Sequence, residues 1–390
     1  MFHLLLALIY ICFISLGLPD SLLGSAWPIL HKDIAVPMSY AGIVSMTITV
    51  GTVISSFLSD RLVRALGTGK ITALSIAMTA VALFGFSISN SFWMLIFWAV
   101  PYGLGAGAVD AVLNNYVALH YKPQHMSWLH CFWGLGAAVS PYIMSFALFK
   151  LESWSRGYLI VFVIQAVLSA VVFASLPLWK QCLKVETGTQ EEVLKASPKF
   201  KDIISINGAI PCLIAFFAYC GFELTASLWA SSYLVQDRGI SVETASALAS
   251  LFYVGITIGR GINGFLAMKF GDRFLIRMGI GIVSLGVLLL FLPFNSVFAM
   301  VGYIVIGFGC APIYPCIIHM TPSIFGRELS QALIGIQMAF AYIGFCLIPP
   351  LFGFIAERIT ISLLPPYLLV LLCVVTIMHE ILVAKTKNKE

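Results

Sequence analysis

The sequence predicts an all-α membrane protein in which twelve transmembrane helices form two pseudo-symmetric six-helix bundles. Three observations support this fold class. Hydrophobic residues make up 60% of the chain and charged residues 10%, whereas soluble domains average about 45–50% and about 25%. The apolar residues form stretches of about 20, which is the length that crosses a bilayer as a helix. Finally, short motifs of the first half recur in the second half.

Twelve stretches meet the length and polarity that a spanning helix requires. They cover roughly 3–26, 37–58, 71–89, 92–119, 126–149, 157–178, 206–235, 242–267, 274–294, 297–320, 329–354 and 361–383. The first stretch has no Lys or Arg before it and no clear small-residue cleavage site, so we expect an uncleaved helix rather than a signal peptide.

A polar segment separates six spans from six. We therefore expect an N-terminal bundle over 1–178, a cytoplasmic linker over 179–205 and a C-terminal bundle over 206–390. Lys and Arg gather in the loops on the side of both termini, which the positive-inside rule places in the cytoplasm. The predicted location is a bacterial inner membrane, with both chain ends inside the cell.

The two halves resemble each other at corresponding places. Ser59–Arg61 after the second span matches Gly271–Arg273 after the eighth, and Gly103–Gly105 in the fourth span matches Gly307–Gly309 in the tenth. Two similar six-helix halves joined by a linker are typical of secondary transporters, which bind their substrate near the membrane midplane.

The fourth and fifth spans carry several polar residues inside apolar sequence. Asp110, Asn114, Asn115 and His130 are all deep in these spans. Ionisable residues within a membrane usually face a water-filled cavity or a partner. Glycines precede Asp110 and flank Trp133, which allows close helix packing. The sequence therefore predicts that this hairpin forms the polar wall of a buried cavity.

Three acidic residues are candidates for proton coupling. Asp20 follows Pro19 in the first span, Asp110 lies near the middle of the fourth, and Glu223 lies near the middle of the seventh. A buried carboxyl group that binds and releases a proton supplies what a symporter requires. The alternative is a structural carboxyl that caps backbone or is fixed by another helix.

Amide, imidazole and indole groups within the spans are candidates for substrate binding. Amides and imidazole can hydrogen-bond sugar hydroxyls, and tryptophan rings can stack on sugar faces. The candidates are Asn114, Asn115, His130, Trp133, Trp27, Trp229 and Gln337. Helix packing, or for the tryptophans an aromatic belt at the membrane surface, is the alternative interpretation.

Four charged residues are interpreted as gate residues. Asp60, Arg61 and Arg64 follow the second span, where we expect electrostatic contacts between the halves rather than substrate contacts. Arg260 lies within the eighth span, and we expect it to pair with an acid or with backbone at the inner gate.

The loop after the second span resembles the signature G-x-L-x-D-R-x-G-R-R of the major facilitator superfamily. Asp60, Arg61 and Arg64 stand at matching places, while Ser56 and Val63 depart from the signature. The corresponding stretch 264–271 keeps the spacing after the eighth span but has Met268 where Asp is usual. The resemblance covers essentially the whole chain, because the twelve-span layout also fits.

Within that superfamily the chain looks most like the fucose–proton symporter group. Members carry an acidic residue late in the first helix and another in the fourth, followed by Asn. Asp20, Asp110 and Asn114 stand at those places, whereas His130 departs from the amide usual in the fifth helix. The resemblance implies sugar transport driven by protons.

The predicted function is secondary active transport of a small neutral polar solute, most simply a monosaccharide, by proton symport through rocker-switch alternating access. Three buried carboxylates against one arginine disfavour an anionic substrate. A Walker-type phosphate loop is missing from the sequence, which argues against ATP as the energy source. We expect a monomer that contacts the bilayer and a sugar-like solute, binds no nucleic acid and needs no cofactor; H⁺ is the expected coupling ion and Na⁺ remains open.

Three other functions were weighed. Proton-coupled efflux of cationic or amphipathic compounds would also use buried acids and aromatic residues. An intramembrane aspartyl protease would need YD and GxGD contexts, which Pro19-Asp20 and Gly107-Ala108-Val109-Asp110 do not provide. A sensor or scaffold that kept the fold and lost transport is the third alternative, against which the retained Asp20, Asp110 and Glu223 argue only mildly.

Overall fold

The structure is a computed structural model that describes residues 2–20, 22–37, 40–179, 198–240, 242–292 and 296–387. Every regular element in these ranges is a helix. Eleven helical stretches among the described residues are long and apolar enough to cross a membrane, and α11 (Val242–Leu266) occupies the place of the remaining expected span. The predicted all-α membrane fold is therefore confirmed.

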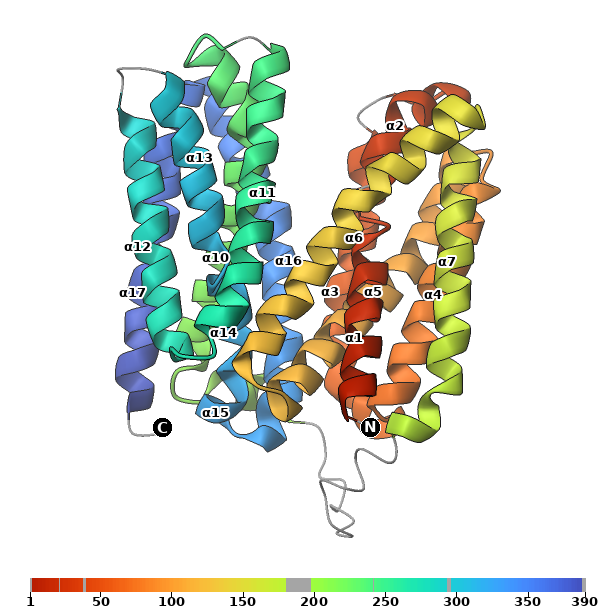
Figure 1. Cartoon of the computed structure of the whole chain (residues 1–390), viewed down its shortest axis with the longest axis horizontal. Helices are drawn as coiled ribbons and strands as arrows, with labels where there is room; N and C mark the ends of the chain where they lie inside the picture. Colours follow the sequence, from red (N-terminus) through yellow and green to blue (C-terminus); the bar gives the residue numbers. More distant parts are fainter. Residues whose placement is uncertain are drawn as a thin grey trace. The chain divides into compact units, whose positions relative to one another are not determined.

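The helices follow the expected spans closely (Figure 1). Before the linker they are α1 (Phe2–Gly17), α2 (Leu22–Asp33), α3 (Tyr40–Leu66), α4 (Thr68–Ser87), α5 (Phe92–His120), α6 (Pro123–Lys150) and α7 (Trp154–Ala174). After it they are α9 (Phe200–Ile204), α10 (Ala209–Gln236), α11, α12 (Asp272–Phe291), α13 (Ser296–Cys310), α14 (Ile313–His319), α15 (Thr321–Phe325), α16 (Arg327–Arg358), the short 3₁₀ helix η1 (Ile361–Leu363) and α17 (Leu364–Thr386).

The chain divides into two compact units. The first comprises Met1–Tyr116 and Phe132–Ser197, and the second comprises Val117–Cys131 and Pro198–Glu390. The beginning of α6 therefore belongs to the second unit and the rest of α6 to the first. Of the expected linker 179–205, residues 180–197 lie outside the described residues, and the expected boundaries at 178 and 206 stay predictions.

In the first unit, close helix packing depends on glycine. A Cβ atom on Gly103 would lie 2.1 Å from the carbonyl oxygen of Ile48, and one on Gly107 would lie 2.3 Å from that of Thr52. Because a real Cβ does not come so near another atom, only glycine allows α5 to cross α3 at this distance. The predicted close approach of the helix that carries Asp110 is thus confirmed.

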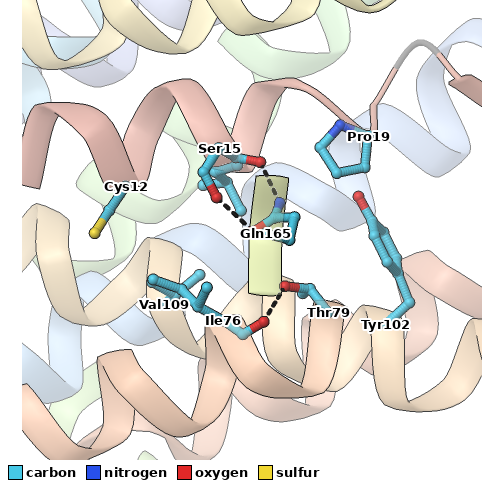
Figure 2. A pocket seen from close by; sticks show the side chains of 9 residues that line it. Cys12, Ser15, Pro19, Ile76, Thr79, Tyr102, Val109 and Gln165 are labelled. Atoms are coloured by element: carbon cyan, nitrogen blue, oxygen red, sulfur yellow. Dashed lines mark hydrogen bonds between the residues drawn. The ribbon is translucent and has the colours of Figure 1, made fainter. Parts of the chain in front are cut away.

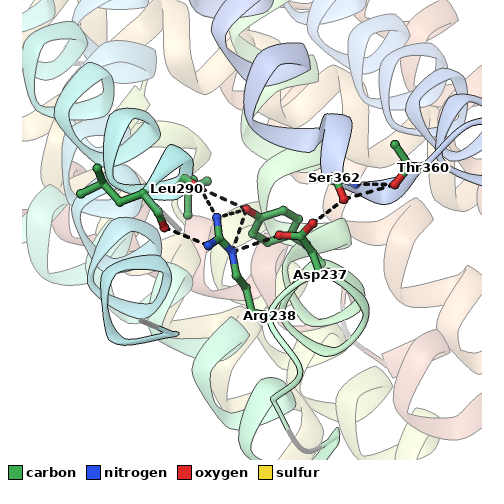
Figure 3. A network of polar contacts seen from close by, with 7 residues as sticks. Asp237, Arg238, Leu290, Thr360 and Ser362 are labelled. Carbon is green, nitrogen blue, oxygen red and sulfur yellow. Dashed lines mark hydrogen bonds and ion pairs between the residues drawn. The ribbon is translucent and has the colours of Figure 1, made fainter. Parts of the chain in front are cut away.

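In the second unit, α10 packs mainly against α16 and α17, and α12 packs against α13. A polar network ties the end of α10 to α12 and η1 (Figure 3). Arg238 donates to the carbonyl of Leu290 and, at 2.7 Å, to the Tyr233 hydroxyl, while Ser362 donates to Asp237. A cation is favourable here because the last carbonyls of a helix carry partial negative charge.

Two of the expected spans are found as membrane-spanning stretches, His3–Asp33 and Val297–Phe325, but each contains a break in its helix. The stretch 3–26 is divided between α1 and α2, and the stretch 297–320 between α13 and α14. Proline explains each break, since it lacks the backbone N–H that a helix needs. Pro19 lies between α1 and α2, and Pro312 lies between α13 and α14.

Candidate functional site

Asp20 lies at the break between α1 and α2 and is an exposed residue. The Trp133 indole donates from Nε1 to Oδ2 at 3.0 Å, and the Tyr102 hydroxyl lies 3.4 Å from Oδ1. Both donors come from other helices of the first unit, α6 and α5. Two aromatic side chains therefore hold the Asp20 carboxylate in place.

The Trp133 contact depends on a close crossing of α1 and α6. A Cβ atom on Gly17 would lie 2.1 Å from the Trp133 carbonyl oxygen, and one on Gly136 would lie 2.1 Å from the Ile14 carbonyl oxygen. Side chains at either position would push the two helices apart. The glycine pair thus brings the Trp133 ring to Asp20.

The end of α1 is also held by an amide from α7. Gln165 donates from Nε2 to the Ser15 carbonyl at 2.6 Å, and the Ser15 hydroxyl donates to Gln165 Oε1 at 2.6 Å. In a continuous helix the Ser15 carbonyl would accept from residue 19, but Pro19 has no N–H to give. Gln165 therefore satisfies the acceptor that the break frees.

A small cavity adjoins this contact (Figure 2). Its volume is about 10 Å³, and Ser15, Gln165, Thr79 and Tyr102 are its polar lining residues. That volume is near the lower limit for a single water molecule, which needs two to four polar partners. The cavity is far too small for a sugar.

Asp110 and Asn114 contact each other on α5. The Asn114 amide donates from Nδ2 to Asp110 Oδ1 at 2.8 Å, as expected for residues one turn apart. Asp110 is 5% exposed, and Asn114 is fully buried. Asn115 is buried too, but it points about 100° away around the helix. Asp110 and Asn114 therefore share one face of α5.

Glu223 of α10 is the acidic residue of the second unit. The Tyr219 hydroxyl lies 2.6 Å from Glu223 Oε2 and 2.8 Å from the carbonyl oxygen of Cys310, at the broken end of α13. Arg260 of α11 lies 3.7 Å from Glu223, measured from Nη2 to Oε1. The expectation that Arg260 pairs with an acid is confirmed, and its predicted role at a gate stays a prediction.

His130 is buried in the second unit. Its ring contacts the Tyr314 ring edge to face, with centroids 4.8 Å apart, and Tyr314 in turn packs on Phe216. The Tyr314 hydroxyl lies 3.2 Å from the Met338 sulfur. The Tyr314 ring therefore covers one side of the imidazole, and the predicted hydrogen bond of His130 to substrate stays a prediction.

Three other substrate candidates make contacts within the protein. Trp27 is 3% exposed and packs in the apolar core of the first unit. Gln337 is fully buried and donates to Cys212 at 3.0 Å while accepting from Thr321 at 3.1 Å. These contacts favour packing roles for both residues. Trp229 donates to the Pro349 carbonyl at 3.0 Å and lines an open groove of about 600 Å³.

The predicted gate residues of the first unit lie at the end of α3. Asp60 is buried and accepts from Arg64 Nε at 2.9 Å, one turn further along the helix. Arg61 is exposed. The Asp60–Arg64 pair therefore forms within one helix, and the predicted contact between the two halves stays a prediction.

The sequence prediction missed three residues that hold the candidate acids. Tyr102 and Tyr219 contact Asp20 and Glu223, and Gln165 secures the break beside Asp20. Tyr219 stands four residues before Glu223, a helical spacing that would have identified it. Gln165 is an isolated amide in an apolar span, which is a comparable signal.

Comparison with known proteins identifies the family. The model of the Major Facilitator Superfamily matches residues 9–208 and 211–389. The glucose/mannose transporter GlcP of Bacillus subtilis is 21% identical over 390 residues, covering 98% of this chain and 95% of the relative. The hexuronate transporter of the same bacterium is 25% identical over 272 residues, covering 64% and 60%.

Solved structures agree with this fold. The Escherichia coli fucose:proton symporter FucP superposes with a TM-score of 0.77 at 14% identity, covering 97% of this chain and 98% of that one. The proton:xylose symporter XylE gives a TM-score of 0.71 at 11% identity, covering 96% and 94%. With both parts of the chain matched by the family model, carboxylates inside apolar helices and the fold of solved transporters, this protein belongs to the Major Facilitator Superfamily.

Proposed function

We propose that the protein moves a small neutral polar solute, a monosaccharide, across the membrane by proton symport. The observation that carries this proposal is Asp20, an exposed acidic residue inside a membrane span whose carboxylate Trp133 and Tyr102 hold at a helix break. Sugar hydroxyls are good donors to such a carboxylate, and irregular backbone inside a membrane is tolerated where it lines a cavity or is buried in protein. The similarity to a glucose/mannose transporter and to a hexuronate transporter supports a sugar-like solute.

Asp110 is the proposed proton carrier, together with Asp20. Its carboxyl is buried and receives one hydrogen bond from Asn114 through Oδ1. Protonation neutralises the site and favours solute binding, after which rocker-switch alternating access exposes the site to the other side of the membrane. Release of the proton there completes import.

The test follows external pH in a lightly buffered, de-energised suspension of cells that express the protein. Adding the transported sugar should make the medium more alkaline, because each sugar carries a proton inward. Asp110→Asn should abolish this change, since the amide cannot bind and release a proton. Asp202→Asn is the matched control, because Asp202 is exposed at α9, remote in sequence from either candidate acid.

Other outcomes would replace parts of the proposal. Uptake that requires sodium and leaves the pH unchanged would keep the sugar and change the coupling ion. Lack of any sugar uptake, together with resistance to amphipathic cations that Asp110→Asn removes, would establish efflux instead.

A further inference from the structure

An open groove in the second unit lies between the last turns of α10 and α16. Its volume is about 600 Å³, which is within the range of about 300–1,000 Å³ typical of ligand pockets. On α10 the groove extends from Trp229 to Gln236. On α16 it extends from Pro350 to Glu357, a length of about two turns or roughly 10 Å. The polar lining side chains, Gln236 and Glu357, both lie toward the helix ends.

The Trp229 ring forms one wall of this groove and is fixed by α16. Its Nε1 donates to the Pro349 carbonyl at 3.0 Å, and its ring contacts the Phe352 ring edge to face with centroids 5.6 Å apart. A Cβ atom on Gly353 would lie 2.6 Å from Cζ2 of the indole, so glycine is needed for the ring to lie so close to α16. Contacts within the second unit therefore set the position of this wall.

The groove adjoins an apolar face of α16. Leu347, Leu351 and Phe354 follow one another at spacings of four and three residues, which places them on one side of the helix. They are 58%, 53% and 56% exposed, and Phe354 also lines the groove. Lipid tails are as apolar as leucine side chains, and α16 is long and apolar enough to span a membrane. This face therefore offers an acyl chain a continuous path into the groove.

Charges of both signs lie beside the groove at the end of α16. Glu357 and Arg358 are both exposed, and the Arg358 guanidinium lies over the Phe354 ring, with Cζ 4.8 Å from the ring centroid. In the part of the chain that the structure describes, the Glu357 carboxylate has no ion-pair or hydrogen-bond partner. Asp237 at the end of α10 differs, because Arg238 compensates it at 3.0 Å. A carboxylate and a guanidinium side by side complement a zwitterion.

We propose that this groove binds a phospholipid whose headgroup carries a primary ammonium, of the phosphatidylethanolamine type. The ammonium donates to Glu357, and the phosphate accepts from the planar donors of Arg358. An acyl chain fills the groove against Trp229 and Phe354. A choline headgroup has no N–H to donate, and a glycerol headgroup has no positive charge for the carboxylate. This inference goes beyond the proposed function and does not depend on the transported solute or on the coupling ion.

The experiment is native mass spectrometry of the purified full chain, released from detergent that contains equal amounts of ethanolamine, choline and glycerol phospholipids with identical acyl chains. The wild type should retain the ethanolamine lipid over the choline lipid about two- to fivefold, as expected for one exposed ion pair. Glu357→Gln should remove this preference, because the amide carries no negative charge. Arg358→Gln should weaken the retention of all three lipids, since each carries a phosphate.

A filled groove tests the acyl-chain part of the proposal. Ala356 lines the groove, so Ala356→Phe occupies the space of the chain and should weaken the retention of all three lipids without changing any charge. Ala356→Leu replaces it if the larger variant does not accumulate. Soluble phosphoethanolamine carries the same headgroup without chains and should not displace the lipid. Thermal unfolding in detergent verifies that each variant is folded.

Glu152→Gln is the matched control. Glu152 is another exposed carboxylate close to the end of a spanning helix, α6, but it does not line the groove, so this variant should keep the lipid preference of the wild type. Equal retention of the ethanolamine and choline lipids by the wild type overturns the proposal, as does an unchanged preference in Glu357→Gln. Displacement of the lipid by phosphoethanolamine or by a sugar overturns it too, because the groove would then hold a soluble molecule.

Discussion

Replacement of Gly136 with Ala should separate α1 from α6 and release Asp20 from Trp133. The new Cβ would lie 2.1 Å from the Ile14 carbonyl oxygen, whereas ordinary contact begins at 3.4 Å. The helices must therefore move apart by about 1.3 Å, the difference between the two distances. Trp133 lies one turn away on α6, so its 3.0 Å bond to Asp20 should lengthen to about 4 Å and be lost.

The stability lost in Gly136→Ala combines two effects. Overpacking typically costs about 1–3 kcal/mol, and a hydrogen bond to a charged group contributes about 1.5–3 kcal/mol. Because the two helices relax together, we expect a loss of about 2–4 kcal/mol, below the sum of the upper values. Thermal unfolding in detergent measures the stability, and sugar-dependent alkalinisation measures transport; both should fall clearly.

Gly24 provides a matched control on α2. A Cβ atom there would meet nothing within 4 Å, so Gly24→Ala should leave transport intact and, because alanine favours helix, raise stability by about 0.5–1 kcal/mol. The reasoning is refuted if Gly136→Ala keeps both the thermal midpoint and the alkalinisation of the wild type. An equal loss in Gly24→Ala would show that helix spacing is not the cause.

Two further predictions concern contacts outside the crossing. Gln165→Leu leaves the buried Ser15 carbonyl without its side-chain donor, so the thermal midpoint should fall by the equivalent of about 1–3 kcal/mol; an unchanged midpoint would mean that water replaces the amide. Arg238→Met removes the donors to Leu290 and Tyr233, and should lower the midpoint while sugar-dependent alkalinisation persists; loss of alkalinisation at full stability would instead place Arg238 in the transport site.

Much of the architecture could be predicted from the sequence because apolar length and polarity decide whether a helix spans a bilayer. The close packing beside Asp110 was also predictable, since only glycine permits it. The exact positions of the helix breaks were not predicted, because hydropathy averages over a window and does not register one missing N–H. Pro19 and Pro312 carried that signal locally.

The candidate site was predicted less completely. A single sequence reveals which helix carries an acid, and periodicity reveals neighbours on the same helix, as for Asp110 and Asn114. Contacts between helices, such as Trp133 with Asp20 or Arg260 with Glu223, depend on how distant segments pack. Trp27 and Gln337 were predicted to bind substrate but make contacts within the protein instead. Gln337 hydrogen-bonds Thr321 and Cys212, and Trp27 packs in the apolar core.

The broken first span also has a consequence for how the protein enters the membrane. α1 has 16 residues and α2 has 12, and each is shorter than the roughly 20 residues needed to cross a bilayer. Neither piece can be inserted by itself, so the insertion machinery must accept both as one segment. The partners of Asp20, Tyr102 and Trp133, are synthesised much later. The carboxylate must therefore stay sheltered from lipid during synthesis until α5 and α6 arrive, which makes the order of helix assembly part of this protein's biogenesis.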